Sequence, residues 1–539
     1  MSVSLPRYLD PRRYARALWR WRAEQREHRG RGRAERGYRA RPVGITGRGE
    51  RVVLCEGMWD NPNHFFRLHL MLAAMPDIAE CRVIGILRRH SERAQRRSLT
   101  SVGVSEFVYL DEDPVTADAF AVEARRLLSG VRRHRDLLEL PLPHRLPAYV
   151  YYDTVVKQTR HPQPPLDSPV WHRALAELLR NVGIYGRLFE RHEVARVVTS
   201  HPWKSEFAAL VWMGLVHDVV SYYVTGFCDS TRIRRFARLS DFATPVEHGT
   251  GKEYDALPLA TQRRLIEYGA AYLDERERGT STDINARYAF HPERRHAERA
   301  AARRALGLPP DRPVAAVFTQ AWFDFPHTFG MHNFTDFLDW IRFTAARISE
   351  NTSVSWLLKP HPCDDWYGGI RLRDVVGTLP SHVYVCPEDT DSLTARVAAD
   401  AIVTVHGTIG IEAAARGLPV LNADRSQYTD WGFTHLATSP EHYAALLAEI
   451  TALAPPTAVQ RDRAMAFAAL SLAPPPAGLG LVRTSCDTSA PPFLYGEIAA
   501  RLETGGQAWE RERSAITEWL ATGHPCYAAY NTTRAFSDE

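Results

Sequence analysis

The chain has 539 residues, of which 45% are hydrophobic and 24% are charged, with 33 Gly and 35 Pro. These ordinary globular values exclude a chain that is disordered throughout, a collagen-like repeat and a coiled-coil rod. The length predicts two large domains or three modest ones, each able to bury a sizeable core. The net charge of +4 alone indicates no preference for charged partners.

That charge is unevenly placed. Residues 1–51 contain 15 Arg against 5 Asp and Glu, so the rest of the chain is mildly acidic. Residues 1–45, which we call the basic arm, predict either a surface helix on anionic lipid or a solvated, partly ordered tail. Nucleic acid attracts the same charge, but no recognisable nucleic-acid-binding fold follows the arm, so we expect no nucleic-acid partner.

Cysteine usage and hydropathy indicate the compartment. The seven cysteines are scattered with no CxxC pair, which argues against a disulfide scaffold or a zinc ribbon and favours a reducing environment. No run reaches 18 apolar residues, and no apolar segment follows the basic residues at the N-terminus. We therefore expect a cytoplasmic protein, peripheral to the inner membrane if the basic arm binds lipid.

After the arm, short apolar runs alternate with helical stretches, the pattern of a parallel α/β sheet. In this first series we expect helices at 63–75 and 207–216 and strands at 51–55, 81–87, 107–110, 148–152, 194–200 and 219–225. The basic segment 232–240 receives no element, and residues 240–300 are expected to be mostly helical.

A Pro-bounded turn at 307–313 introduces a second α/β series. Its expected strands are 314–319, 354–358, 383–386, 401–405 and 419–421, with helices at 336–347, 392–398 and 411–416. Pro-rich breaks and a helical tail near 507–520 follow. The sequence thus predicts an α/β protein with two doubly wound, Rossmann-like domains facing a cleft, in which ligands bind at the carboxyl ends of the strands.

The most informative segment is 401–424, AIVTVHGTIGIEAAARGLPVLNAD. An apolar strand leads into His406, Gly407 and Thr408, and a short Ala-rich helix begins there. A glycine-containing loop at a helix N-terminus presents N–H groups to an anion, and the Thr408 hydroxyl adds a donor. Glu412, in the first turn, can accept hydrogen bonds from ribose hydroxyls. The alternative is a plain strand–turn–helix in which glycine only permits the turn.

A second motif, Lys359-Pro360-His361-Pro362, follows another strand. Lys359 brings a positive charge and His361 a ring donor to the rim of the sheet, and the prolines hold the turn rigid. A structural histidine in a loop is the alternative. Only four of the 67 basic residues are lysines, so the placing of Lys359 here favours a need for a compact ammonium group.

Together these motifs, with the segment 428–434 (YTDWGFT), resemble the capsule-polysaccharide-synthesis group of GT-B glycosyltransferases, which includes bacterial Kdo transferases that use CMP-Kdo. The resemblance covers roughly residues 314–450. It implies that a C-terminal domain holds a nucleotide-sugar donor, with Lys359 and His361 on phosphate and Thr408 and Glu412 on phosphate and ribose. Members often have Gln followed by Pro after the first strand of this domain, whereas this chain has Gln320-Ala321.

This likeness gives roles to the expected domains. Residues 46–300 would form the acceptor-side domain and residues 301–455 the donor-side domain, between the basic arm and a Pro-rich connection with a helical tail at 456–539. GT-B enzymes generally need no catalytic metal, and we find no convincing HExxH or DxD-type pair; the spacing of His327 and His332 suits no standard metal motif. No cofactor is expected.

The N-terminal domain is expected to supply reacting groups. Carboxylates at the carboxyl end of a strand face the cleft, so Glu56 and Asp60 are candidates for general base or nucleophile, with His64 as a possible base. Each can instead be a helix cap or a surface charge. Segment 199–204 and the pair Asp153 and Lys157 are further candidate linings, and Asp324 follows the first strand of the second series.

The reading that these residues favour is a glycosyltransferase acting on a cell-surface polysaccharide or glycolipid, with a nucleotide sugar as donor. A nonhydrolysing sugar-nucleotide 2-epimerase and a polyol-phosphate transferase of the teichoic-acid type share features of the architecture. A non-catalytic scaffold that binds nucleotide or glycan is the third alternative, because fold does not imply activity.

Overall fold

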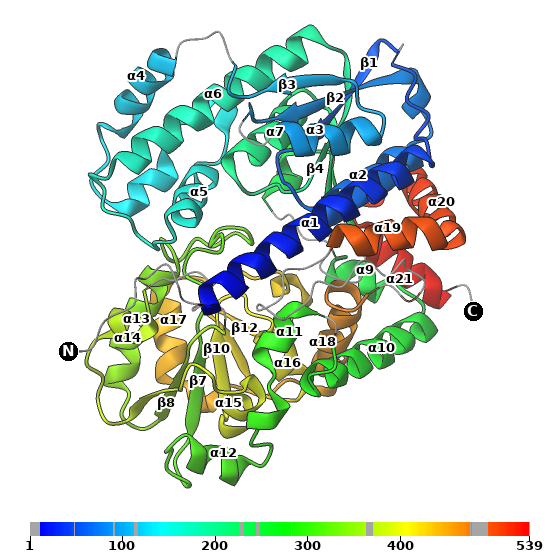
Figure 1. Ribbon diagram of the computed structural model, residues 1–539. Helices are drawn as coiled ribbons and strands as arrows, with labels where there is room; N and C mark the ends of the chain where they lie inside the picture. The colour runs from blue at the N-terminus through cyan, green and yellow to red at the C-terminus, as the bar shows by residue number, and fades with distance from the viewer. Residues whose placement is uncertain are drawn as a thin grey trace, which may run out of the picture.

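The structure is a computed structural model, shown in Figure 1, that describes residues 11–47, 49–89, 92–112, 117–225, 231–243, 248–281, 283–362, 370–474, 476 and 494–537. Its two sheets lie in separate halves of the molecule, one above the other in Figure 1. No helix in these ranges is long and apolar enough to cross a membrane.

The first sheet has the strand order β3-β2-β1-β4-β5-β6. Its strands are β1 (Arg51–Glu56), β2 (Cys81–Leu87), β3 (Glu106–Tyr109), β4 (Val194–Thr199), β5 (Val220–Thr225) and β6 (Arg232–Phe236). All neighbours are parallel except β6, which pairs antiparallel with β5. The central strand β1 is buried almost throughout, as expected of a strand covered on both faces.

The second sheet, in the order β12-β11-β10-β7-β8-β9, is parallel throughout. Its strands are β7 (Val314–Phe318), β8 (Ser355–Lys359), β9 (Val383–Val385), β10 (Ala401–Thr404), β11 (Val420–Asn422) and β12 (His435–Leu436). Numbered within each half, both sheets read 3-2-1-4-5-6, the order of a doubly wound fold. The expected fold class of two Rossmann-like sheets is confirmed.

Helices cover both faces of each sheet (Figure 1). Those within and before the first series are α1 (Pro11–Arg39), α2 (Pro62–Ala74), α3 (Glu92–Ser101), α4 (Ala117–Leu128), α5 (Tyr149–Thr159), α6 (Pro169–Arg191), α7 (Ser205–Val216) and α8 (Leu239–Phe242). Those of the second series are α13 (Phe337–Glu350), α14 (Leu372–Val376), α15 (Ser392–Ala398), α16 (Ile409–Ala415) and α17 (Pro440–Ala448).

The helices between and after the two series are divided between the halves. They are α9 (Gly251–Asp255), α10 (Leu259–Glu277), α11 (Ile284–Ala289), α12 (Arg299–Ala305), α18 (Ala458–Ser471), α19 (Leu494–Thr504), α20 (Gly506–Thr522) and α21 (Tyr527–Ser537). In Figure 1, α9–α12 and α18 lie beside the second sheet, and α19 and α20 lie beside the first. Among these helices, α10 packs against α18 and α12 against α15. In the tail, α20 packs back onto α2.

Most of the basic arm forms α1, whose described side chains from Ala23 onward alternate between buried and exposed. The helix packs against α19 and α3. A Cβ at Gly30 would lie 2.6 Å from the backbone nitrogen of Gly496, so this close crossing requires glycine. From Ala23 to Arg39 the arm is therefore a docked helix and not a solvated tail.

Two sequence expectations about local structure are wrong. Residues 148–152, expected as a strand, begin α5; the apolar run is buried inside a helix that continues through Lys157, and a short apolar run cannot distinguish the two. The basic segment 232–240 contains β6, with Arg232 and Arg234 buried. Their guanidinium groups donate to the carbonyls of Leu470 and Ala473 and to the sulfur of Cys526, which offsets the cost of burial.

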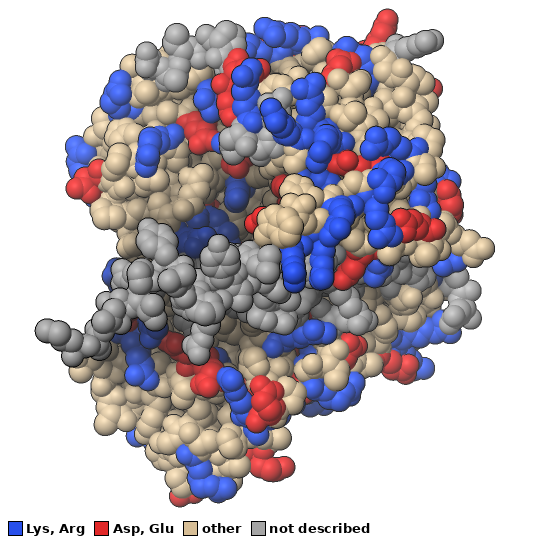
Figure 2. Space-filling model, in the orientation of Figure 1, with Lys and Arg blue, Asp and Glu red and all other residues tan. Residues whose placement is uncertain are grey.

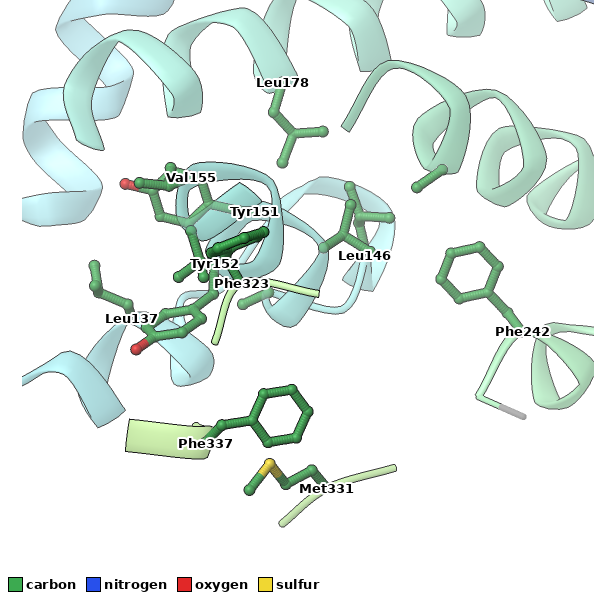
Figure 3. Close-up of a cluster of buried hydrophobic side chains, with 14 of the residues drawn as sticks. Leu137, Leu146, Tyr151, Tyr152, Val155, Leu178, Phe242, Phe323, Met331 and Phe337 are labelled. Atoms are coloured by element: carbon green, nitrogen blue, oxygen red, sulfur yellow. The ribbon is translucent and has the colours of Figure 1, made fainter. Parts of the chain in front are cut away.

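One apolar cluster continues from the first half into the second. Leu137, Leu146 and the α5 tyrosines belong to it together with Phe323 and Met331, which follow β7 (Figure 3). The other faces of the two sheets have clusters of their own. The halves are thus joined by packed side chains at α5, beside the carboxyl ends of the second sheet.

Candidate active site

The shared strand order defines two equivalent positions, one in each sheet. The order reverses between β1 and β4 in the first sheet and between β10 and β7 in the second. In open α/β sheets the loops diverge at such a switch point, and the crevice at the carboxyl ends of these strands is where ligands bind. Of the sequence-predicted residues, Glu56 is the last residue of β1 and His406 follows β10, at these two positions.

At the first switch point, Glu56 is fully buried and its carboxylate is occupied by neighbours. The backbone N–H of Trp59 donates to Oε1 at 2.8 Å. The backbone N–H of Ser200, after β4, donates to Oε2 at 3.1 Å and the Ser200 hydroxyl at 2.5 Å. The side chain therefore ties the loop after β1 to the loop after β4 and presents no exposed oxygen.

His64 and Asp60, the other candidates here, lie on either side of this network. His64 is fully buried on α2, with Nε2 3.0 Å from the carbonyl oxygen of Glu56. Asp60 is 42% exposed and forms an ion pair with Arg31 of α1, and Tyr495 of α19 donates to the same oxygen at 3.3 Å. Asp60 thus joins the loop after β1 to the basic arm and the C-terminal tail.

At the second switch point, glycines allow the loop after β10 to lie against its neighbours. Gln320, after β7, donates to the hydroxyl of Thr404 at 2.9 Å. A Cβ on Gly407 would lie 3.1–3.2 Å from these two side chains, and one on Gly410 would overlap the Tyr428 hydroxyl at 2.1 Å. Tyr428 donates to the carbonyl of Gly407 at 2.9 Å. His406, Gly407 and Thr408 are left half-buried and reachable.

The two histidines of the motifs are neutral at physiological pH. Burial lowers the pKa of His406 to about 4; nearby Asp324 opposes this shift, and His361 and His327 add to it. Burial also lowers the pKa of His361 to about 4, against the opposing effect of Asp324. The edges of Phe329 and Phe337 contact the His406 ring, with centroids 5.0 Å apart. These imidazoles therefore act as neutral hydrogen-bonding groups.

Lys359 and Glu412, the two other residues predicted to contact phosphate and ribose, are more deeply buried than His406. Lys359, the last residue of β8, is 1% exposed, and its Nζ donates to the carbonyl of Pro360 at 3.2 Å. Glu412 is 3% exposed, and its Oε1 accepts from Nε and Nη2 of Arg276 at 3.3 and 3.1 Å. Arg276, on α10, also pairs with Asp283. The sequence did not single out Arg276, since it lies among many other arginines.

Polar contacts cross between the halves at α5, where Asp153 and Lys157 lie. Nδ1 of His327 is 2.6 Å from Oδ1 of Asp153, and the backbone N–H of His327 donates to Oδ2 at 3.1 Å. Nζ of Lys157 lies 2.6 Å from Oδ1 of Asp324. The expected linings of the first domain thus meet the first loop of the second domain.

Two histidines near these contacts have shifted pKa values. Burial would lower the pKa of His327, but the carboxylate of Asp153 outweighs it, so that pKa is raised. Burial lowers the pKa of His201, which follows β4, to about 3, and the charges of Lys204 and Lys157 contribute. Lys157, which pairs with Asp324, is thus one of several charges near His201.

A hollow of about 560 Å³ lies beside the Lys359-Pro360-His361-Pro362 turn, at the carboxyl ends of β8 and β9. Its lining includes Pro360, Pro362 and three arginines from other segments, Arg294, Arg371 and Arg373. Within the described ranges, no group of three or more His, Cys, Asp or Glu side chains is arranged to hold a metal ion.

No protein-family model and no curated protein matches the chain. Among solved structures, a beta Kdo 2,4 transferase, KpsC of Thermosulfurimonas dismutans, is 14% identical with a TM-score of 0.31, over 54% of this chain and 87% of that one. Anabaena Alr3699/HepE, in complex with UDP and glucose, is 11% identical with a TM-score of 0.26, over 88% and 98%. UDP-GlcNAc 2-epimerase from Neisseria meningitidis, bound to UDP-GlcNAc, is 8% identical with a TM-score of 0.23, over 78% and 97%.

Proposed function

We propose that this protein is a glycosyltransferase that moves a sugar from a nucleotide-activated donor to a cell-surface polysaccharide or glycolipid acceptor. The observation that carries the proposal is the line of groups across the boundary between the halves. His361 and His406 follow β8 and β10 of the second sheet, and Asp324, which follows β7, pairs with Lys157 of the first half. Two substrates held on facing sheet edges react as if in one molecule.

In this proposal the second half binds the donor. The hollow beside the Pro360 turn takes the nucleoside. Its lining holds three arginines, of which Arg294 and Arg371 pair with the lining carboxylates Asp389 and Glu388, and Arg373 is the guanidinium group that we assign to phosphate. The neutral His361, with the Thr408 hydroxyl, donates hydrogen bonds to phosphate oxygens, and Lys359 supplies a fixed positive charge. These groups stabilise the negative charge that develops on the leaving nucleotide. Electrostatic stabilisation of this kind is usually the largest single contribution to the rate enhancement of an enzyme.

The acceptor enters from the first half, and a carboxylate receives the proton of its attacking hydroxyl. Of the four residues expected to carry catalysis, Glu56 and His64 are fully buried, and Asp60 is turned towards Arg31 of α1 and Tyr495 of α19 instead of towards the second half. Asp324 is 56% exposed and lies between the halves, in contact with Lys157. We therefore propose Asp324 as the general base, with Glu56 and His64 holding the loops in place.

A panel of CMP, UDP, GDP and dTDP sugars tests donor binding. A ligand that binds the folded state raises the melting temperature, by an amount equivalent to about 2.7 kcal/mol at 100 times its Kd. We expect one nucleotide class to do so. His361→Ala and His406→Ala are expected to abolish that shift and to lower turnover about 100-fold or more. His172→Ala, at an exposed histidine of α6, is the matched control and should change neither.

Product analysis separates the alternatives. A transferase requires an acceptor and otherwise gives slow hydrolysis, whereas a 2-epimerase converts the nucleotide sugar alone. Binding without turnover over all donors and acceptors would indicate a scaffold. A panel with no melting shift at all, or a His361→Ala variant that keeps full activity, would contradict the site assignment.

A further inference from the structure

The outward face of α1 carries a line of arginines at helical spacing. Arg22, Arg26, Arg29, Arg33 and Arg36 follow one another at alternating intervals of four and three residues, and all five are exposed. At 3.6 residues per turn this spacing keeps them within about 80° of the helix circumference, along about 21 Å of its length. We call these five residues the arginine strip.

The inward face fixes the direction in which the strip points. Ala23, Ala34 and Tyr38 are buried on the side away from the strip, and Gly30 lies against the backbone of α19. Arg31, 6% exposed, forms an ion pair with Asp60 and donates to the Tyr495 hydroxyl at 2.6 Å. Because these contacts come from two other segments, α1 cannot roll and the strip stays on the surface.

Neighbouring residues extend the positive surface. α3 packs beside α1 and adds the exposed Arg93, Arg96 and Arg97. Glu503 pairs with Arg33, with both side chains about half exposed. At the N-terminal end of the described side chains Trp21 is 56% exposed. Figure 2 shows the resulting band of basic side chains along α1, which runs across the front of the molecule in this view.

We propose that the arginine strip is a docking surface for an anionic lipid bilayer. Guanidinium groups bind lipid phosphates, and clustered basic residues are attracted to an anionic leaflet. An exposed Trp beside them suits the boundary between headgroups and acyl chains. The apolar side of α1 is already packed against protein, so binding is electrostatic and requires no helix insertion.

Charge alone would also suit nucleic acid, but the shape of the strip favours a membrane. Proteins that bind single strands combine a basic groove with aromatic platforms on which bases stack. The strip instead lies on the outside of a straight helix, and no aromatic side chain interrupts the five arginines. The inference is independent of the reaction proposed above, because it concerns a face whose binding can be measured without any donor or acceptor.

Co-sedimentation of the full chain with vesicles tests it. We expect binding to vesicles of equal parts phosphatidylglycerol and phosphatidylcholine, little binding to phosphatidylcholine alone, and loss of binding in high salt, which screens exposed charges. Arg22→Glu/Arg26→Glu/Arg29→Glu should weaken binding about 100-fold, since each basic residue near the surface contributes about a factor of five. The matched control changes three exposed arginines of the other half, Arg263→Glu/Arg278→Glu/Arg304→Glu, and should bind almost as wild type.

Three outcomes would overturn the proposal. They are equal binding to the two kinds of vesicle, equal loss in both triple variants, and tighter binding to single- or double-stranded DNA than to vesicles at the same salt concentration. Melting curves of both variants check that each is folded. Since the substituted side chains are exposed, we expect both to melt within a few degrees of the wild type.

Discussion

The two switch points have the same strand order, but their polar residues differ in burial and in hydrogen bonding. In the first sheet, Glu56 is sealed, with hydrogen bonds from the loops on both sides of the crevice. In the second sheet, Gln320 and Thr404 are buried and hydrogen-bonded to each other, but His406, Gly407 and Thr408 of the following loop are only half-buried. The same topology therefore places the two switch points alike, and the loop residues differ in how deeply they are buried and how fully they are hydrogen-bonded.

The difference has a consequence for how candidate residues are interpreted. A carboxylate at the carboxyl end of a strand suggests catalysis, but Glu56 uses both oxygens to hold the loops after β1 and β4 together. Buried polar groups with complete hydrogen bonding contribute to the order of a site, and removing one partner leaves others unsatisfied. Each prediction below tests one side of this comparison, beginning with the largest expected effect.

Glu56→Gln is expected to lower the free energy of unfolding by about 3 kcal/mol, because a buried donor loses its acceptor and charge-assisted bonds are lost. Oε1 faces the N–H of Trp59 and Oε2 faces the N–H of Ser200, so either orientation of the amide sets an NH2 group against a backbone N–H. Urea unfolding monitored by fluorescence measures the change.

The control for this variant is Glu80→Gln, at a side chain that is 74% exposed, and it should shift stability by less than about 0.5 kcal/mol. If Glu56→Gln were as stable as the wild type but inactive, Glu56 would be a catalytic group and not a structural one. That result would make the two switch points chemically alike.

Much of the fold is readable from the sequence, for a physical reason. Strands buried on both faces are continuous apolar runs, and 51–55, 81–87, 314–319 and 401–405 all correspond to observed strands. The secondary-structure predictions are wrong where tertiary contacts determine the conformation of the segment. The run that begins α5 is apolar on all sides. In β6, Arg232 is buried because carbonyls at the end of α18 accept from it, and Arg234 donates to the sulfur of Cys526.

The sequence predicts where the candidate site residues lie along the strands and helices, but it does not predict their hydrogen-bond and ion-pair partners. The motifs placed His361, His406 and Glu412 at strand ends and a helix start, where the structure has them. Nothing local in the sequence indicates that Arg276 reaches Glu412, 136 residues away, or that His327 meets Asp153, 174 residues away. Such pairs depend on how the halves pack, which periodicity does not encode.

The second switch point should be sensitive to acid. His361 and His406 have folded-state pKa values of about 4 against about 6.5 when unfolded. Below pH 6.5 the unfolded chain binds protons that the folded chain does not, so stability falls as the pH falls from 6.5 towards 4. At pH 5.5 each histidine is expected to cost about 1 kcal/mol relative to pH 7.5.

His361→Gln and His406→Gln should each reduce this acid sensitivity, seen as a shallower slope of unfolding free energy between pH 5 and 7. His172→Gln, at an exposed position on α6, is the control and should leave the slope unchanged. An unchanged slope in both site variants would mean that the two imidazoles titrate as exposed groups, and the proposed neutral donors would be lost.

The smallest expected effect has the opposite sign and concerns the contact that joins the halves. The carboxylate of Asp153 raises the folded-state pKa of His327 against the effect of burial. The stabilisation from this pair is therefore fully present below about pH 6.5 and is lost as the pH rises through the raised value. In Asp153→Asn the difference in unfolding free energy from the wild type should shrink as the pH rises from 6 to 9.

The amide introduced by Asp153→Asn can still accept the backbone N–H of His327 and donate to a neutral ring nitrogen, so the variant removes the charge and keeps the shape. If the pair also holds the halves together, Asp153→Asn should increase proteolysis near the α5 contact most at low pH. A difference that grows with rising pH would show that His327 is held neutral in the folded state. The contact would then join the halves as a plain hydrogen bond, without the charge on which this prediction depends.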